Sequence, residues 1–114
     1  MARKITLEEL RSRIDANPDL VLVEALPERY YRHSHLPGAV NIPHDEVDQH
    51  AAELLPDRHA EIVVYCANGP CRNSGIASAR LEKLGYTNVS DYHEGKDEWV
   101  QAGLPVEGEA RAAA

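Results

Sequence analysis

A buried strand that ends on a cysteine constrains this chain more than any other feature of its sequence. Residues 62–65 are an apolar run typical of a buried strand, and Cys66 follows directly. A loop with Gly69 and Pro70 comes next, and a helix is predicted from about residue 72. This order places a thiol where loop amides and the positive end of a helix dipole converge. We therefore predict that the pKa of Cys66 lies below that of a free cysteine, and that the residue acts on an anionic substrate.

Several residues of this loop also allow a purely structural interpretation. Cys66 could pack as a small hydrophobe, but its place before the loop favours a nucleophile. Cys71 could point into the core, or it could resolve an intermediate on Cys66 by forming a disulfide, and both interpretations stay open. Arg72 could pair with a surface carboxylate, but a loop that holds negative charge favours anion binding. Ser74 could donate a hydrogen bond to the thiolate or only start the helix.

The predicted site is one contiguous segment. Its catalytic candidates are Cys66 and Cys71. Its candidate substrate-binding residues are Ala67, Asn68, Gly69, Pro70, Arg72, Asn73 and Ser74.

Helices and short strands alternate along the rest of the chain. Helices are predicted over residues 7–16, 27–31, 45–55 and 72–84 and around Trp99, and strands over residues 20–23, 39–42, 62–65 and 88–92. This alternation predicts a single three-layer α/β domain with a mainly parallel sheet and helices on both faces. In such sheets the ligand lies at the carboxyl ends of the strands, where Cys66 is expected.

Length and charge narrow the classes of function. A chain of 114 residues is long enough for one domain, which we predict over residues 1–106, with a frayed tail over 107–114. Twelve basic residues against 19 acidic ones give a net charge of −7 without a basic cluster, which argues against nucleic acid as a partner. No apolar stretch approaches the roughly 20 residues of a membrane span, and no apolar signal segment follows the N-terminus. We expect a cytoplasmic protein whose two cysteines serve redox or sulfur chemistry.

The six histidines do not predict a metal site. None forms a pair with the helix spacing or the cysteine partner that a zinc site needs. His35 is expected to hydrogen-bond backbone, and Trp99 to anchor packing. We therefore predict neither a metal nor an organic cofactor.

The order of motifs resembles the rhodanese-like family over about residues 5–106. Residues 22–25 look like the family's Leu-Val-Asp-Val strand, and residues 35–43 match its His-Ile-Pro-Gly-Ala-x-Asn-Ile-Pro signature, although Ser34 replaces the leading Gly. Residues 63–66 are similar to the catalytic strand, and residues 85–105 look like the C-terminal block. The resemblance implies a sulfurtransferase in which Cys66 takes a sulfane sulfur as a persulfide and passes it on.

Two features depart from that family pattern. Glu24 replaces the Asp of the first strand and Leu26 stands where most members have Arg, so the salt bridge that usually braces the fold is not predicted here. Five residues separate Cys66 from Arg72, whereas the commonest active form has four. The longer spacing is similar to that of cysteine-dependent phosphatases and arsenate reductases, whose loops hold a tetrahedral oxyanion.

Three functions follow from these residues. The first is sulfur transfer from a small anionic donor, such as thiosulfate or a persulfide, to a thiophilic acceptor that could be a protein. The second is an oxyanion enzyme, a phosphatase or arsenate reductase, that uses Cys66 and Arg72. The third is a non-catalytic binding or regulatory module in which the loop only recognises a partner.

Overall fold

A parallel sheet forms the centre of the molecule, whose computed structural model describes residues 2–109. Its strands are β1 (Arg3–Lys4), β2 (Val21–Glu24), β3 (Val40–Asn41), β4 (Ile62–Tyr65) and β5 (Val89–Tyr92). They lie in the order β1-β5-β4-β2-β3, and every neighbouring pair runs parallel. The central strand is therefore β4, the one that leads into Cys66.

Helices follow or precede each strand along the chain. They are α1 (Leu7–Ala16), α2 (Glu28–His33), α3 (Val47–Leu54), α4 (Asn73–Lys83) and α5 (Gly95–Gln101). The first helix begins at a capping box, in which Glu9 N–H donates to Thr6 Oγ1 at 3.1 Å and Thr6 N–H donates to the Glu9 side chain at 3.2 Å. None of the helices among residues 2–109 has the length and apolar character needed to cross a membrane.

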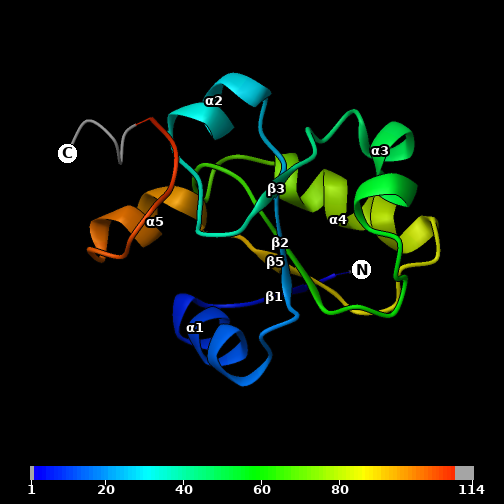
Figure 1. Ribbon diagram of the computed structural model, residues 1–114, viewed down its shortest axis with the longest axis horizontal. Helices are drawn as coiled ribbons and strands as arrows, with labels where there is room; N and C mark the ends of the chain where they lie inside the picture. The colour runs from blue at the N-terminus through cyan, green and yellow to red at the C-terminus, as the bar shows by residue number, and fades with distance from the viewer. Residues whose placement is uncertain (1, 110–114) are drawn as a thin grey trace.

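The helices cover both faces of the sheet, as Figure 1 shows with α1 and α5 on one side and α3 and α4 on the other. The α1 and α5 face is packed by Leu10, Val63, Tyr65 and Trp99. The opposite face is packed by apolar side chains that include Val64, Ala51, Ala77 and Leu81. The predicted three-layer α/β fold is confirmed.

The sequence pattern missed one strand. β1 consists of two exposed, charged residues, Arg3 and Lys4, so no apolar periodicity marks it. It joins the sheet because its backbone pairs with β5 and Ile5 N–H donates to the Asp91 carbonyl at 2.9 Å. A short edge strand of this kind is held by its ladder rather than by its side chains.

The predicted tail, residues 107–114, begins at a residue that the structure ties down. Glu107 forms an antiparallel bridge with His35 through two backbone hydrogen bonds of 2.9 and 3.0 Å. Its carboxylate also accepts a hydrogen bond from Gly38 N–H at 2.9 Å. The last part of that tail, residues 110–114, lies outside the described residues.

Candidate active site

Cys66 lies at the carboxyl end of the central strand. β4 pairs with both β2 and β5, so Tyr65 is level with Glu24 on one side and Tyr92 on the other, and Cys66 is the next residue along the chain. Its side chain is fully buried. The Cys66 Sγ lies 3.5 Å from Ser74 Oγ in the first turn of α4. The predicted meeting of strand end and helix start is therefore present.

The loop that follows, residues 66–72, is called the cysteine loop below. It turns back at Cys71, whose N–H donates to the Asn68 carbonyl at 3.1 Å and to Asn68 Oδ1 at 3.2 Å. The Cys71 carbonyl oxygen lies 3.5 Å from Cys66 Sγ and accepts from the thiol. Both cysteines are free thiols. The turn therefore brings Cys71 back over Cys66.

The first residues of α5 hold the base of the cysteine loop. Lys96 N–H donates to the Cys66 carbonyl and Asp97 N–H donates to the Ala67 carbonyl, both at 2.8 Å. This approach needs Gly95, which has a φ of 77° and at which a Cβ would lie 2.5 Å from the Cys66 carbonyl oxygen. The backbone of Cys66 is therefore fixed from the α5 side, while its sulfur faces α4.

The predicted low pKa of Cys66 is wrong for this arrangement. Burial raises the pKa of Cys66 to about 11, and the hydrogen bond with Cys71 adds to the increase. The Ser74 hydroxyl and amide act in the opposite direction but with a smaller effect. The Cys71 amide does not point at the sulfur because it is bonded to Asn68, and a carbonyl stands there instead.

The remaining candidate residues differ in their exposure and in their hydrogen bonds. Ala67 and Gly69 are half-buried and Pro70 is exposed. Arg72 is exposed, and its guanidinium makes no ion pair within the described part of the chain. Asn73 donates to the Ala25 carbonyl at 3.3 Å, so its side chain is bound to the segment after β2.

Acidic side chains also reach the cysteine loop. Asn68 Nδ2 donates to Asp97 Oδ2 at 3.4 Å, and the Glu94 carboxylate lies 3.3 Å from the position of a Cβ at Gly69. Both carboxylates are exposed. The surroundings of the loop therefore carry negative charge from α5 and its preceding turn beside the positive charge of Arg72.

Sequence reasoning missed a charged cluster beside the cysteine loop, formed by Glu24, Tyr65 and Lys96 and called the Glu24 network below. The fully buried Glu24 carboxylate accepts from Tyr65 Oη at 2.8 Å and from Lys96 Nζ at 3.2 Å. Lys96 Nζ also donates to the Ser34 carbonyl at 2.7 Å. Burial raises the pKa of Glu24, and the charge of Lys96 acts against that increase. A salt bridge is thus present, with Lys96 as its cation, and a glutamate inside an apolar strand was the signal for such a partner.

The structural roles predicted for His35 and Trp99 are confirmed. His35 stacks on Tyr31 with ring centroids 3.8 Å apart, and its Nδ1 lies 2.7 Å from the Tyr31 carbonyl oxygen. Trp99 is buried and its Nε1 donates to the Pro105 carbonyl at 2.8 Å.

Within residues 2–109, no group of three or more His, Cys, Asp or Glu side chains could hold a metal ion.

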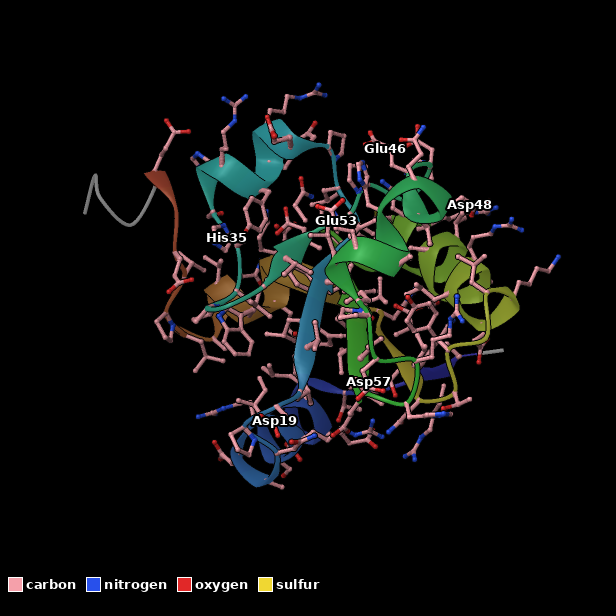
Figure 2. All side chains as sticks on the ribbon, turned by 45° about the vertical axis from the view of Figure 1, so that its right-hand side comes forward. Asp19, His35, Glu46, Asp48, Glu53 and Asp57 are labelled. Carbon is pink, nitrogen blue, oxygen red and sulfur yellow. The ribbon has the colours of Figure 1, made fainter. Side chains whose placement is uncertain are left out.

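A hollow of about 550 Å³ lies at the opposite edge of the sheet. Figure 2 shows two of its lining residues, Asp19 and Asp57, which precede β2 and β4, on the side of the molecule away from Glu46 and α2. This is the amino edge of the strands. Ligands of open parallel sheets bind at the carboxyl edge, so we place the site at the cysteine loop and not in this hollow.

The fold and the cysteine loop agree with a family of known proteins. The model of the rhodanese-like domain matches residues 6–102, and the chain therefore belongs to the rhodanese-like family. The chain is 38% identical to the HTH-type transcriptional regulator Rv0324 of Mycobacterium tuberculosis over 90% of its own length and 44% of the regulator. It is 41% identical to the thiosulfate sulfurtransferase PspE of Escherichia coli over 58% of its length and 61% of that protein.

A solved structure shows the same relation. The thiosulfate sulfurtransferase from Pseudomonas aeruginosa superposes with a TM-score of 0.80 at 27% identity, over 94% of this chain and 20% of that one. The chain spans about half the length of the curated relatives it matches. Its resemblance to sulfurtransferases supports sulfur transfer as the general chemistry of the domain.

Proposed function

We propose that this domain is a sulfurtransferase in which Cys66 accepts a sulfane sulfur as a persulfide and passes it to a thiophilic acceptor. The observation that carries the proposal is the position of Cys66, at the carboxyl end of the central parallel strand and 3.5 Å from Ser74 at the start of α4. The sulfurtransferases among its relatives support the same class of reaction.

The proposed reaction has two steps. The Cys66 thiolate attacks the outer sulfur of a donor such as thiosulfate, so that a new S–S bond forms on Cys66 and sulfite leaves with the electrons of the broken bond. A thiophilic acceptor, such as a thiolate, then attacks the sulfane sulfur and Cys66 leaves as a thiolate. Neither step as written uses a metal or an organic cofactor.

The neighbouring residues support these steps in different ways. The Ser74 hydroxyl and amide favour the thiolate form of Cys66. The exposed charge of Arg72 is free to meet an anionic donor at the mouth of the loop. The backbone of Ala67, Asn68 and Gly69, together with Pro70 and Asn73, shapes the space in which the added sulfur would lie.

We also propose a small anionic sulfur donor, a thiol or protein acceptor, and the cytoplasm as the compartment. A cysteine nucleophile works as a free thiol, and a reducing compartment keeps it in that form. The surplus of acidic residues, 19 against 12, argues against nucleic acid as the acceptor.

A mass measurement tests the assignment of Cys66. Cleavage after arginine yields a peptide of residues 59–72, which contains both cysteines. Incubation of reduced Cys71→Ser, in which Cys66 is the one remaining thiol, with thiosulfate should add the mass of one sulfur atom to this peptide. Cys66→Ser should abolish that addition and also the formation of thiocyanate from thiosulfate and cyanide. Thiocyanate formation at the wild-type rate in Cys66→Ser would show that the assignment is wrong.

Parallel incubations separate the other two functions. An oxyanion enzyme should hydrolyse an aryl phosphate or reduce arsenate with a thiol present, and should leave thiosulfate unreacted. A regulatory module should neither hydrolyse the phosphate nor reduce arsenate, and it should not turn over thiosulfate. One specific observation favours this role as the alternative to sulfur transfer, namely the 38% identity to a transcriptional regulator. Sulfur loading of Cys66 without turnover in the presence of an acceptor would point to that role.

A further inference from the structure

The second cysteine of the cysteine loop has its backbone next to the sulfur of the first. The Asn68–Cys71 turn, closed by hydrogen bonds of 3.1 and 3.2 Å, folds Cys71 back so that its carbonyl is 3.5 Å from Cys66 Sγ. A sulfur species on Cys66 would therefore form next to another cysteine.

The two thiols differ in exposure. Cys66 is fully buried, whereas Cys71 is half-buried and faces less protein. Once Cys66 carries the added sulfur atom, an external thiol meets the outer sulfur before the sulfur that is bonded to the Cys66 Cβ. Cys71 is already inside the loop and does not have to enter.

We propose that Cys71 discharges the Cys66 persulfide from within, by attacking its inner sulfur to release hydrosulfide and leave a Cys66–Cys71 disulfide. This inference rests on the proposed function, because it starts from the persulfide. The Cys71 thiol loses its proton to solvent, and its thiolate forms the new S–S bond to Cys66 Sγ. The bond between the inner and outer sulfur breaks, and the outer sulfur leaves with both electrons as hydrosulfide. The sulfane sulfur is reduced, the two cysteines are oxidised, and an external thiol or dithiol must restore them.

The direction of attack follows from the leaving groups. Attack on the outer sulfur would expel the Cys66 thiolate, whereas attack on the inner sulfur expels hydrosulfide. A thiol of lower pKa leaves faster, and burial raises the pKa of Cys66 to about 11. Hydrogen sulfide is a much stronger acid than a thiol in that environment. The inner attack is therefore the faster of the two for a neighbour that can reach both sulfurs.

The test is a single turnover of the full chain, reduced, freed of reductant and held without oxygen. One equivalent of thiosulfate is added, then hydrosulfide is assayed and the 59–72 peptide is weighed. Wild-type protein should release about one hydrosulfide per chain and give a peptide two hydrogens lighter than the dithiol. Cys71→Ser and Cys71→Ala should instead keep the extra sulfur atom at least tenfold longer and release no hydrosulfide. Cys66→Ser should show neither product.

The outcomes separate this inference from the proposed function. If no variant gains a sulfur atom, the proposed function has failed. If wild type and Cys71→Ser both gain the sulfur and keep it equally long, the proposed function stands and the inference is overturned. A persulfide found on Cys71, with no hydrosulfide released, would also overturn it, because Cys71 would then relay sulfur outward. Wild-type protein that forms the disulfide under a mild oxidant, while oxidised Cys71→Ser proceeds to sulfinic acid on Cys66, would support the contact between the two sulfurs.

Discussion

The carboxyl ends of β2 and β4 lie side by side, and each carries a buried ionisable group, but the two groups differ in how strongly they are hydrogen-bonded. At the end of β2 the carboxylate of Glu24 has two strong partners, Tyr65 at 2.8 Å and Lys96 at 3.2 Å. At the end of β4 the thiol of Cys66 makes two weak hydrogen bonds of 3.5 Å, to the Cys71 carbonyl oxygen and to Ser74 Oγ. Both groups are fully buried. The comparison shows that the buried carboxylate at this edge is held by short hydrogen bonds, whereas the buried thiol beside it is held only by long ones. A weakly held thiol can exchange its partners during a reaction.

One residue joins the two regions. The side chain of Lys96 belongs to the Glu24 network, while its backbone N–H holds the Cys66 carbonyl at 2.8 Å. The rigid network thus supports the base of the cysteine loop without touching its sulfur. Predictions that disturb one region should reveal how far the other depends on it.

The largest effect is expected from removing the carboxylate of the network. Glu24→Ala leaves Lys96 buried without its partner, which should cost about 3–5 kcal/mol of unfolding free energy. Denaturant unfolding measures this loss. The double variant Glu24→Met with Lys96→Met serves as the control, because replacing both charges by apolar side chains should recover most of the stability. A loss below about 1 kcal/mol in Glu24→Ala would show that the network is not a supporting element.

The next effect concerns the contact that joins the regions. Gly95→Ala adds a Cβ at 2.5 Å from the Cys66 carbonyl oxygen at a φ of 77°. It should destabilise the domain by about 1–3 kcal/mol and slow sulfur loading of Cys66, because the base of the loop must move. Gly103→Ala is a matched control, since Gly103 has a φ of 78° and no atom within 4 Å of such a Cβ. Equal losses of stability and loading in both variants would mean that backbone strain, and not the clash with Cys66, is responsible.

The sequence predicted the region that depends on local pattern and missed the one that depends on distant pairing. The apolar run before Cys66 and the helix after it lie within 22 residues, so periodicity alone locates the strand end and the helix start. Glu24 and Lys96 are 72 residues apart, and no local rule pairs them. The sequence also did not predict the direction of the pKa shift of Cys66. That direction depends on the orientation of the Cys71 peptide group, which is set by the hydrogen bonds of the turn to Asn68.

A smaller effect is expected from the proton of Cys66. The pKa of this thiol rises from an ordinary value of 9.0 to about 11 in the folded protein, so the folded state holds the proton more tightly than the unfolded state. This stabilisation is complete below about pH 9 and is lost as the pH rises through about 11. Wild-type protein should therefore lose about 1 kcal/mol relative to Cys66→Ser between about pH 8 and pH 10. The alkylation rate of Cys66 should rise over the same range, and a rate that levels off below about pH 8 would show a thiolate already formed.

The smallest effect is expected from Arg72, the exposed cation of the cysteine loop. Its guanidinium has no ion pair among residues 2–109, so Arg72→Ala should change the unfolding free energy by less than about 0.5 kcal/mol. Loading from thiosulfate should slow by about two- to fivefold, the size of an exposed charge contact, and the difference should shrink in high salt. Arg80→Ala is the matched control, because Arg80 is an exposed arginine of α4, the helix that follows Arg72, and is bound to Asp48 at 2.6 Å. Loading that slows equally in both variants would mean that the net charge of the domain, and not the place of Arg72, attracts the donor. A slower rate in Arg72→Ala alone would show that the cysteine loop uses its unpaired cation, Arg72, to attract the substrate. The Glu24 network, in contrast, uses its paired cation, Lys96, to stabilise the fold.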